Sequence, residues 1–215
     1  MTVILKETHE KILRKLRRKH LWIQIIELIF FSILMTSSLG FNWFAEIERK
    51  IVNESYGILK TNAKEMQARI KLLEILRSKP LTVGQALAVA DVLIDETKRK
   101  NVKAPLILAV IEQESEFKSI ATSNKGARGV MQIMPETWKL YGPQGEFGKA
   151  ANNIYDPAQN MRVGISYLND LLNEHKNLEK ALSTYYSGQS NFEGSRTYIR
   201  QVMAKAKQFE SDLEK

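Results

Sequence analysis

Three glutamates occupy alternate positions in the segment AVIEQESEFKS, residues 109–119: Glu112, Glu114 and Glu116. A carboxyl group held in an apolar environment favours its neutral form, because burial penalises the negative charge. A protonated carboxyl can donate a proton to a leaving group near neutral pH, which is the chemistry of a general acid. The spacing of the neighbouring residues decides which glutamate, if any, faces the protein interior.

The apolar residues of this segment select Glu114. Pro105 suits the first turn of a helix, since it lacks a backbone N–H that would go unsatisfied there, and no helix breaker follows it up to Phe117. At about 100° per residue, Glu114 continues the apolar stripe of this helix. The stripe consists of Ile107, Val110 and Ile111. Glu112 and Glu116 project to the opposite face, where we expect them to be solvated. A buried glutamate that is satisfied by a hydrogen bond and has no catalytic role remains the alternative for Glu114.

A second segment, TSNKGARGVMQIMPETW at residues 122–138, joins a polar loop to an apolar stretch and a proline that can begin a helix. Gly126 and Gly129 allow a tight backbone turn next to a ligand. The Gln132 amide can both donate and accept hydrogen bonds, as sugar hydroxyl and acetamido groups require. Alternatively, the methionines of this stretch fill the core and Gln132 is merely tolerated.

Together these segments resemble the family 1 lytic transglycosylases, bacterial enzymes that cleave the glycan strands of peptidoglycan on a lysozyme-like fold. That family has a Glu-Ser pair at a helix end, then a serine, then the block Gly-Ala-x-Gly-Leu-Met-Gln-Ile-Met-Pro-x-Thr. Here the pair is Glu114-Ser115, the serine is Ser123, and the block is residues 126–137 with Val130 in place of Leu. The resemblance selects the same glutamate as the apolar stripe.

Two later segments are also similar to the family. In NIYDPAQNMRVGISYL, residues 153–168, we expect Asp156 to cap a helix rather than to catalyse, and Gly164 to permit close helix packing. In ALSTYYSG, residues 181–188, Tyr185 matches a family tyrosine that lies close to the acid. A tyrosine that simply packs in the core is the alternative.

Two departures from the family pattern stand near the C-terminus. Tyr186 replaces the usual Asn, which makes a sugar contact from that position uncertain. In FEGSRTYIRQVM, Gly194 and Ser195 occupy the positions of a family Glu-Thr pair, while Tyr198 keeps its place. A polar contact is therefore either lost here or supplied by Glu193, one residue earlier.

The resemblance covers roughly residues 85–203 and implies a reaction with a single enzyme carboxylate. Glu114 protonates the glycosidic oxygen, and the C6 hydroxyl of N-acetylmuramic acid then closes a 1,6-anhydro ring. The positions carried over from the family as substrate-binding are Ser123, Gln132, Met134 and Tyr185. The predicted partner is the glycan strand of peptidoglycan.

The resemblance implies no cofactor and no metal. The histidines do not suggest one either, because the three are far apart in sequence: His9, His20 and His175. Two other functions stay open. A hydrolase of goose-lysozyme type needs a second carboxylate, for which Asp156 or Glu136 are forced candidates. A non-catalytic scaffold in a cell-envelope assembly is conceivable because of the departures at Tyr186 and Gly194.

The charge distribution argues against nucleic acid as a partner. The chain has 215 residues and a net charge of +8, but residues 1–20 hold seven Lys or Arg against two Glu. A folded nucleic-acid reader would carry its basic surface on the domain itself. With no cysteine in the chain, disulfides and thiolate chemistry are also excluded.

The N-terminal region predicts attachment to a membrane. A basic tail, residues 1–20, precedes an apolar segment, residues 21–44, whose one charge is Glu27 and whose length suits a membrane-spanning helix. The basic flank predicts a cytoplasmic N-terminus, so the remainder lies outside the cytoplasm, in the periplasm. A cleaved signal peptide and a buried helix of a soluble protein are the alternatives.

The rest of the chain predicts a mainly α protein. Residues 45–79 carry apolar residues at helical spacing and read as a helical stalk, with Gly57 as a point where it could break. Pro80 marks the start of a helical, lysozyme-like catalytic domain, residues 80–215, with a small or absent β element.

Overall fold

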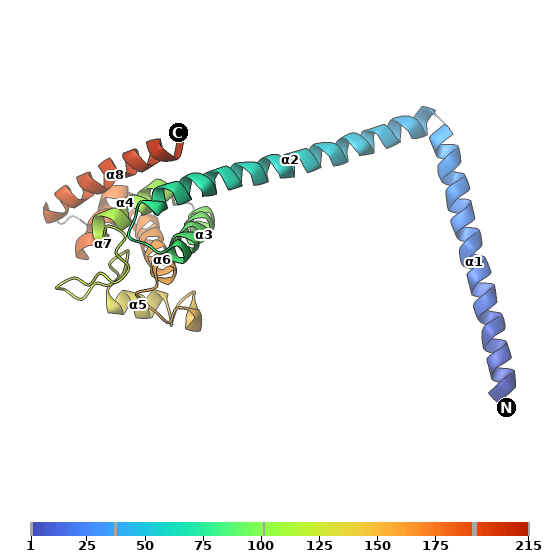
Figure 1. The fold of residues 1–215 in the computed structure, drawn as a ribbon, viewed down its shortest axis with the longest axis horizontal. Helices are drawn as coiled ribbons and strands as arrows, with labels where there is room; N and C mark the ends of the chain where they lie inside the picture. Colours follow the sequence, from blue (N-terminus) through green and yellow to red (C-terminus); the bar gives the residue numbers. More distant parts are fainter. Residues whose placement is uncertain (1, 37, 101, 191–192, 215) are drawn as a thin grey trace. The chain divides into compact units, whose positions relative to one another are not determined.

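The computed structural model describes residues 2–36, 38–100, 102–190 and 193–214 and is mainly helical (Figure 1). The helices are α1 (Thr2–Thr36), α2 (Ser38–Arg77), α3 (Val83–Lys100), α4 (Ala104–Glu114), α5 (Pro135–Tyr141), η1 (Gly148–Ala150), α6 (Pro157–His175), α7 (Leu178–Ser187), η2 (Glu193–Ser195) and α8 (Arg196–Glu214). Within the described ranges the β structure is limited to isolated bridges, from Thr122 to Arg128 and from Arg128 to Ile133. The prediction of a mainly α protein with a small or absent β element is confirmed.

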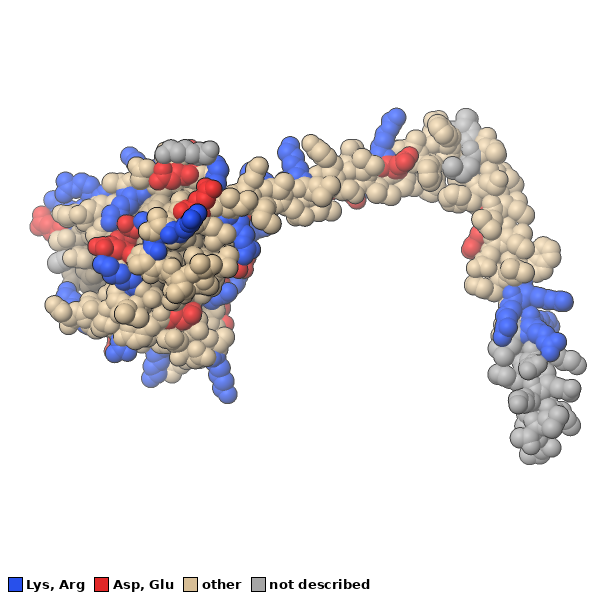
Figure 2. Space-filling model, viewed as in Figure 1, with Lys and Arg blue, Asp and Glu red and all other residues tan. Residues whose placement is uncertain are grey.

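The first compact unit, Met1–Ala63, contains α1 and the first part of α2. The predicted stalk is helical as far as Arg77, and Gly57 lies inside α2 without breaking it. Basic side chains gather on the described part of α1 (Figure 2). They are Arg14, Lys15, Arg17, Arg18 and Lys19.

Along the described chain, no helix combines the length and the hydrophobicity needed to cross a lipid bilayer. The predicted anchor or signal segment, residues 21–44, is thus not confirmed and stays a prediction.

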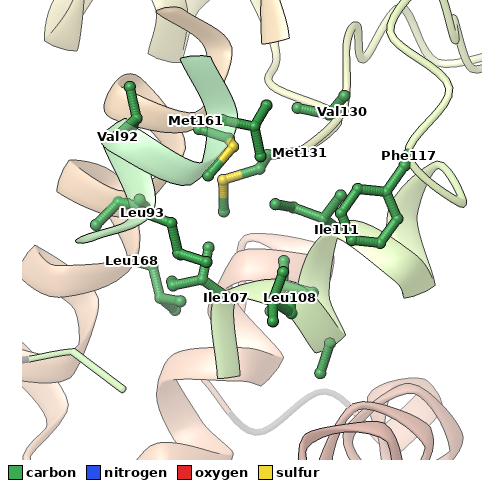
Figure 3. Close-up of a cluster of buried hydrophobic side chains, with 14 of the residues drawn as sticks. Val92, Leu93, Ile107, Leu108, Ile111, Phe117, Val130, Met131, Met161 and Leu168 are labelled. Atoms are coloured by element: carbon green, nitrogen blue, oxygen red, sulfur yellow. The ribbon is translucent and has the colours of Figure 1, made fainter. Parts of the chain in front are cut away.

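The second compact unit, Lys64–Lys215, is built around α4. Residues Ile107 to Ile111 of α4 are fully buried, because this stretch of the helix is apolar on every side. Helix α4 packs against α8, while α3, α5 and α7 pack against α6. Figure 3 shows side chains of α4 meeting those of α3, α6 and the loop before α5 in one cluster. The end of α2 belongs to this core through Leu72 and Leu76.

Helix α6 begins as its sequence predicts. Pro157 occupies its first turn, and the Asp156 carboxylate accepts a hydrogen bond from the Gln159 backbone N–H at 2.8 Å. The expected role of Asp156 as a helix cap is therefore confirmed. Gly164 permits a close approach to the loop before α5, since a Cβ atom there would lie 2.5 Å from the Met131 sulfur. Its expected role in helix packing stays a prediction.

Helices α3 and α6 are also joined by a buried charge. Glu96 is completely buried, and its Oε1 lies 3.1 Å from the guanidinium groups of both Arg99 and Arg162. Glu146 forms further ion pairs with Arg99 and with Lys100. A buried carboxylate needs such partners, because an uncompensated charge in the interior is costly.

Candidate active site

The candidate acid is the last residue of α4. After Glu114 the Ser115 N–H still bonds to the Ile111 carbonyl, but the chain then leaves the helix through two residues with positive φ, 52° at Glu116 and 63° at Phe117. Positive φ is strained for residues other than glycine and needs support from the surrounding structure. That support comes from Phe117, whose side chain is buried in the core.

Glu114 is half-buried, and its Oε1 accepts a hydrogen bond of 2.6 Å from the Tyr198 hydroxyl of α8. Burial raises the pKa of Glu114 from 4.5 to about 7, and the hydrogen bond from Tyr198 opposes part of that rise. The described residues supply no ion pair for this carboxylate. Glu114 therefore holds a proton close to neutral pH, as a general acid must.

The other two glutamates of the segment differ from each other. Glu116 is exposed and pairs with Lys118 at 2.9 Å, which lowers its pKa, so the prediction of a solvated residue is confirmed. For Glu112 the prediction is wrong. Its carboxylate pairs with Lys79 at 2.8 Å, and its side chain is only 26% exposed. The physical reason is tertiary, because the Lys79 ammonium is held over the Phe117 and Phe209 rings after α2 ends.

The loop that follows α4 is fastened to α6 by Asn160. The buried Asn160 amide donates to the carbonyls of Arg128 and Ile154 at 3.0 and 2.8 Å, and its oxygen accepts from the Met131 N–H at 2.8 Å. Gly129 makes this possible: its φ is 78°, and a Cβ atom there would lie 2.3 Å from the Asn160 amide nitrogen. The sequence required a glycine in this loop but did not reveal its partner.

A second fastening joins the loop to α4 itself. The Ser115 hydroxyl donates to the Val130 carbonyl at 2.7 Å, directly beside Glu114 in the sequence. Two buried polar side chains therefore hold this loop beside Glu114: Ser115 at the end of α4 and Asn160 on α6.

Two of the predicted substrate-binding residues are engaged by the loop's own backbone. The Ser123 hydroxyl accepts from the Ala127 N–H at 3.0 Å. The Gln132 amide nitrogen donates to the carbonyls of Ala121 and Gly129 at 3.2 and 2.9 Å, from a backbone with φ 50°. These bonds use the side-chain amide hydrogens of Gln132 and leave its side-chain oxygen as an acceptor that a ligand could use.

The other two predicted residues lie at the edges of the same loop. Met134 is 40% exposed and directly precedes Pro135, the first residue of α5. The Tyr185 hydroxyl donates to the Met131 carbonyl at 2.8 Å. Burial raises the pKa of Tyr185 well above its usual value. The negative charge of Glu114 raises this pKa further.

Sequence reasoning missed the role of Tyr198. Tyr198 keeps its place in the family pattern, and this was the only hint in the sequence that it has a role. The packing of α8 on α4 is what brings its hydroxyl to Glu114. The Tyr198 ring is stacked on Tyr186, with ring centres 4.7 Å apart and an angle of 25°. Glu193, the suggested substitute for a lost polar contact, is exposed and pairs with Arg196 at 3.4 Å, and a contact from it to a ligand stays a prediction.

The forced candidates for a second carboxylate are placed differently from Glu114. Asp156 caps α6, and Glu136 is exposed in the first turn of α5. Within the described part of the chain, no group of three or more His, Cys, Asp or Glu side chains is arranged to hold a metal ion.

The fold is a helical domain, and the candidate site holds a partly buried carboxyl group, Glu114, whose pKa is raised to about 7. The chain belongs to the transglycosylase SLT domain family, whose profile matches residues 91–209.

Among similar proteins, the membrane-bound lytic murein transglycosylase C of Mannheimia succiniciproducens is 37% identical over 84 residues, covering 37% of this chain and 23% of that protein. The transglycosylase of Enterobacteria phage PRD1 is 34% identical over 99 residues, covering 45% of this chain and 34% of that protein. The chain thus matches about a third or less of the length of these relatives.

Among solved structures, an inactive mutant of the lytic transglycosylase Slt from Pseudomonas aeruginosa is similar with a TM-score of 0.44 and 25% identity, covering 54% of this chain and 23% of that one. The 70 kDa soluble lytic transglycosylase from Escherichia coli gives a TM-score of 0.45 and 23% identity, again over 54% of this chain and 23% of that one.

Proposed function

We propose that this protein is a peptidoglycan lytic transglycosylase that cleaves the β-1,4 bond between N-acetylmuramic acid and N-acetylglucosamine. The observation that carries the proposal is the state of Glu114: burial raises its pKa to about 7, and its hydrogen-bond partner is a neutral phenol rather than a cation. Membership of the SLT domain family, and relatives named lytic murein transglycosylases, support glycan strands as the substrate.

In the proposed reaction, protonated Glu114 donates its proton to the glycosidic oxygen as the bond to the N-acetylmuramic acid C1 breaks. The resulting carboxylate then accepts the proton of the C6 hydroxyl, whose oxygen attacks C1 and closes the 1,6-anhydro ring. The proton returns to Glu114, so the enzyme is unchanged and no water enters the product. A carboxyl group with a pKa of about 7 suits both steps, because neither of its protonation states is strongly disfavoured near neutral pH.

We assign substrate contacts to Ser123, Gln132, Met134 and Tyr185. For Gln132 we assign the contact to the side-chain amide oxygen, because the amide nitrogen already donates to two backbone carbonyls. Met134 offers an exposed apolar surface to a sugar ring. Besides the assigned contacts, the Ser123 and Tyr185 hydroxyls hold the loop, through their bonds to the Ala127 N–H and the Met131 carbonyl.

A hydrolase would require a second carboxylate that activates or replaces a water molecule. The cap formed by Asp156 and the exposed position of Glu136 favour the mechanism with a single carboxylate.

Digestion of sacculi in heavy-oxygen water tests the proposed function. Ring closure yields fragments that end in 1,6-anhydro-N-acetylmuramic acid and carry no label, because the attacking oxygen comes from the substrate. Hydrolysis yields reducing ends that are heavier by one labelled water. Labelled ends that disappear in Glu114→Gln would establish a hydrolase instead, and release of no fragment by a protein that binds glycan would establish a scaffold.

We also propose that the protein acts outside the cytoplasm, at the cell envelope, where its substrate lies. Relatives named membrane-bound lytic murein transglycosylase C support this location. Cell fractionation with protease treatment tests it: residues 45–215 should be cleaved from the outer side only. Attachment through residues 21–44 and association with an envelope assembly remain predictions, and the same fractions would show whether the chain is intact, cleaved as a signal peptide would be, or soluble.

A further inference from the structure

Tyr186 presents a large aromatic ring to solvent beside the candidate acid. One face of the ring is covered by the stacked Tyr198 ring, with centres 4.7 Å apart. Tyr198 is 5% exposed, whereas Tyr186 is 49% exposed. The stack therefore has a buried member and an open member, and the buried member is the one whose hydroxyl bonds to Glu114 at 2.6 Å.

The backbone that carries Tyr186 is well fixed. Helix α7 ends one residue later, and Gly188, with φ 77°, closes the helix by donating its N–H to the Thr184 carbonyl at 2.7 Å. The Ser187 hydroxyl also donates back to the Ser183 carbonyl at 2.8 Å. An exposed ring on such a backbone, held on one side by stacking, loses little conformational freedom when it meets a ligand.

We propose that the open face of Tyr186 is a binding platform for one pyranose ring of the glycan, next to the bond that Glu114 cleaves. The C–H groups on one face of a sugar ring carry a slight positive charge, and they complement the negative face of an aromatic ring while removing apolar surface from water. The proposal rests on the proposed function in taking a glycan as the ligand. It also gives a role to the position where this chain departs from the family's usual Asn.

The ring and the hydroxyl of Tyr186 make separable contributions. A platform depends on the aromatic face, so Tyr186→Phe should retain it, whereas Tyr186→Ala and Tyr186→Leu should not. If the hydroxyl were the binding group, Tyr186→Phe would be as harmful as Tyr186→Ala.

The experiment measures binding without turnover, in full-length protein that carries Glu114→Gln. The probe is the soluble tetramer of N-acetylglucosamine, titrated by calorimetry. We expect Tyr186→Ala and Tyr186→Leu to raise the Kd about five- to tenfold, as loss of one aromatic contact does, and Tyr186→Phe to change it less than about twofold. The matched control is Tyr56→Ala, which removes another exposed tyrosine, 66% exposed on α2, and should leave the Kd unchanged.

Thermal unfolding of each variant confirms that a weaker binder is still folded. An unchanged Kd in Tyr186→Ala, an equal loss in Tyr186→Phe, or failure of the Glu114→Gln parent to bind the probe overturns the platform. The proposed function is judged on a different result, the heavy-oxygen products of the unmodified protein, so the two proposals can fail separately.

Discussion

Glu96 and Glu114 are two carboxylates withdrawn from water in the same unit, one on α3 and one at the end of α4. Glu96 is completely buried but has two guanidinium groups 3.1 Å from its Oε1. Glu114 is less deeply buried, yet the contact it makes is to the Tyr198 phenol, and burial raises its pKa to about 7.

The comparison shows that burial alone does not make a general acid. A carboxylate paired with cations joins elements of the fold, as Glu96 joins α3 to α6. A desolvated carboxylate whose partner is neutral retains its proton at higher pH. The chemistry of the two positions therefore depends on whether a cation reaches them.

The largest effect that we expect in this comparison is on catalysis. Glu114→Gln preserves the size of the side chain but cannot donate a proton, so activity on sacculi should fall by about two orders of magnitude or more. Release of soluble muropeptides, measured by chromatography, checks this. Glu116→Gln is the control, since its exposed carboxylate pairs with Lys118, and an equal loss there would contradict the assignment of the acid.

The next largest effect concerns stability at the other carboxylate. Glu96→Gln removes the negative charge between Arg99 and Arg162, and we expect the free energy of unfolding to fall by about 3 kcal/mol. Urea denaturation at neutral pH measures it. Glu65→Gln is the matched control, because Glu65 forms an exposed pair with Lys98 at 3.0 Å and should cost less than about 1 kcal/mol. Similar losses in both variants would mean that the buried ion pairs of Glu96 stabilise the fold no more than the exposed pair of Glu65 does.

A third prediction links the acid to stability through pH. The folded-state pKa of Glu114 is raised to about 7 from 4.5, so between these values the folded protein binds a proton that the unfolded chain releases. The free energy of unfolding should therefore decrease as pH rises from about 4.5 to about 7, by roughly 2 kcal/mol from this one group. Urea midpoints at the two pH values, compared between the unmodified protein and Glu114→Gln, isolate the contribution of Glu114 to this pH dependence. The same pH dependence in both proteins would refute it.

The smallest effect tests the hydrogen bond between Tyr198 and Glu114. Tyr198→Phe removes the hydrogen bond that lowers the pKa of Glu114, so this pKa should rise further above about 7. In the proposed reaction activity depends on protonated Glu114, so its decline at alkaline pH should move to higher pH in the variant. A profile of kcat/KM against pH measures the shift, and a decline that moves to lower pH would reverse the assigned role of Tyr198.

The sequence allowed much of the site to be predicted because helix periodicity is local. Residues three, four and seven positions apart share one face of a helix, which selected Glu114 from three glutamates on one short segment. The cap at Asp156 and the glycine at position 129 are likewise set by local backbone requirements, and the structure confirms the cap and gives the glycine a φ of 78°.

Contacts between distant parts of the chain could not be predicted in this way. Glu112 was expected in solvent, but Lys79, 33 positions earlier, reaches it once α2 packs on the core. Arg162 meets Glu96 across 66 positions, and Tyr198 meets Glu114 across 84. Periodicity says which face of a helix is buried but not which side chain of another helix will lie against it. The sequence by itself determined that Glu114 faces inward, whereas only the packing of α8 on α4 decided that a phenol, and not a cation, would meet it.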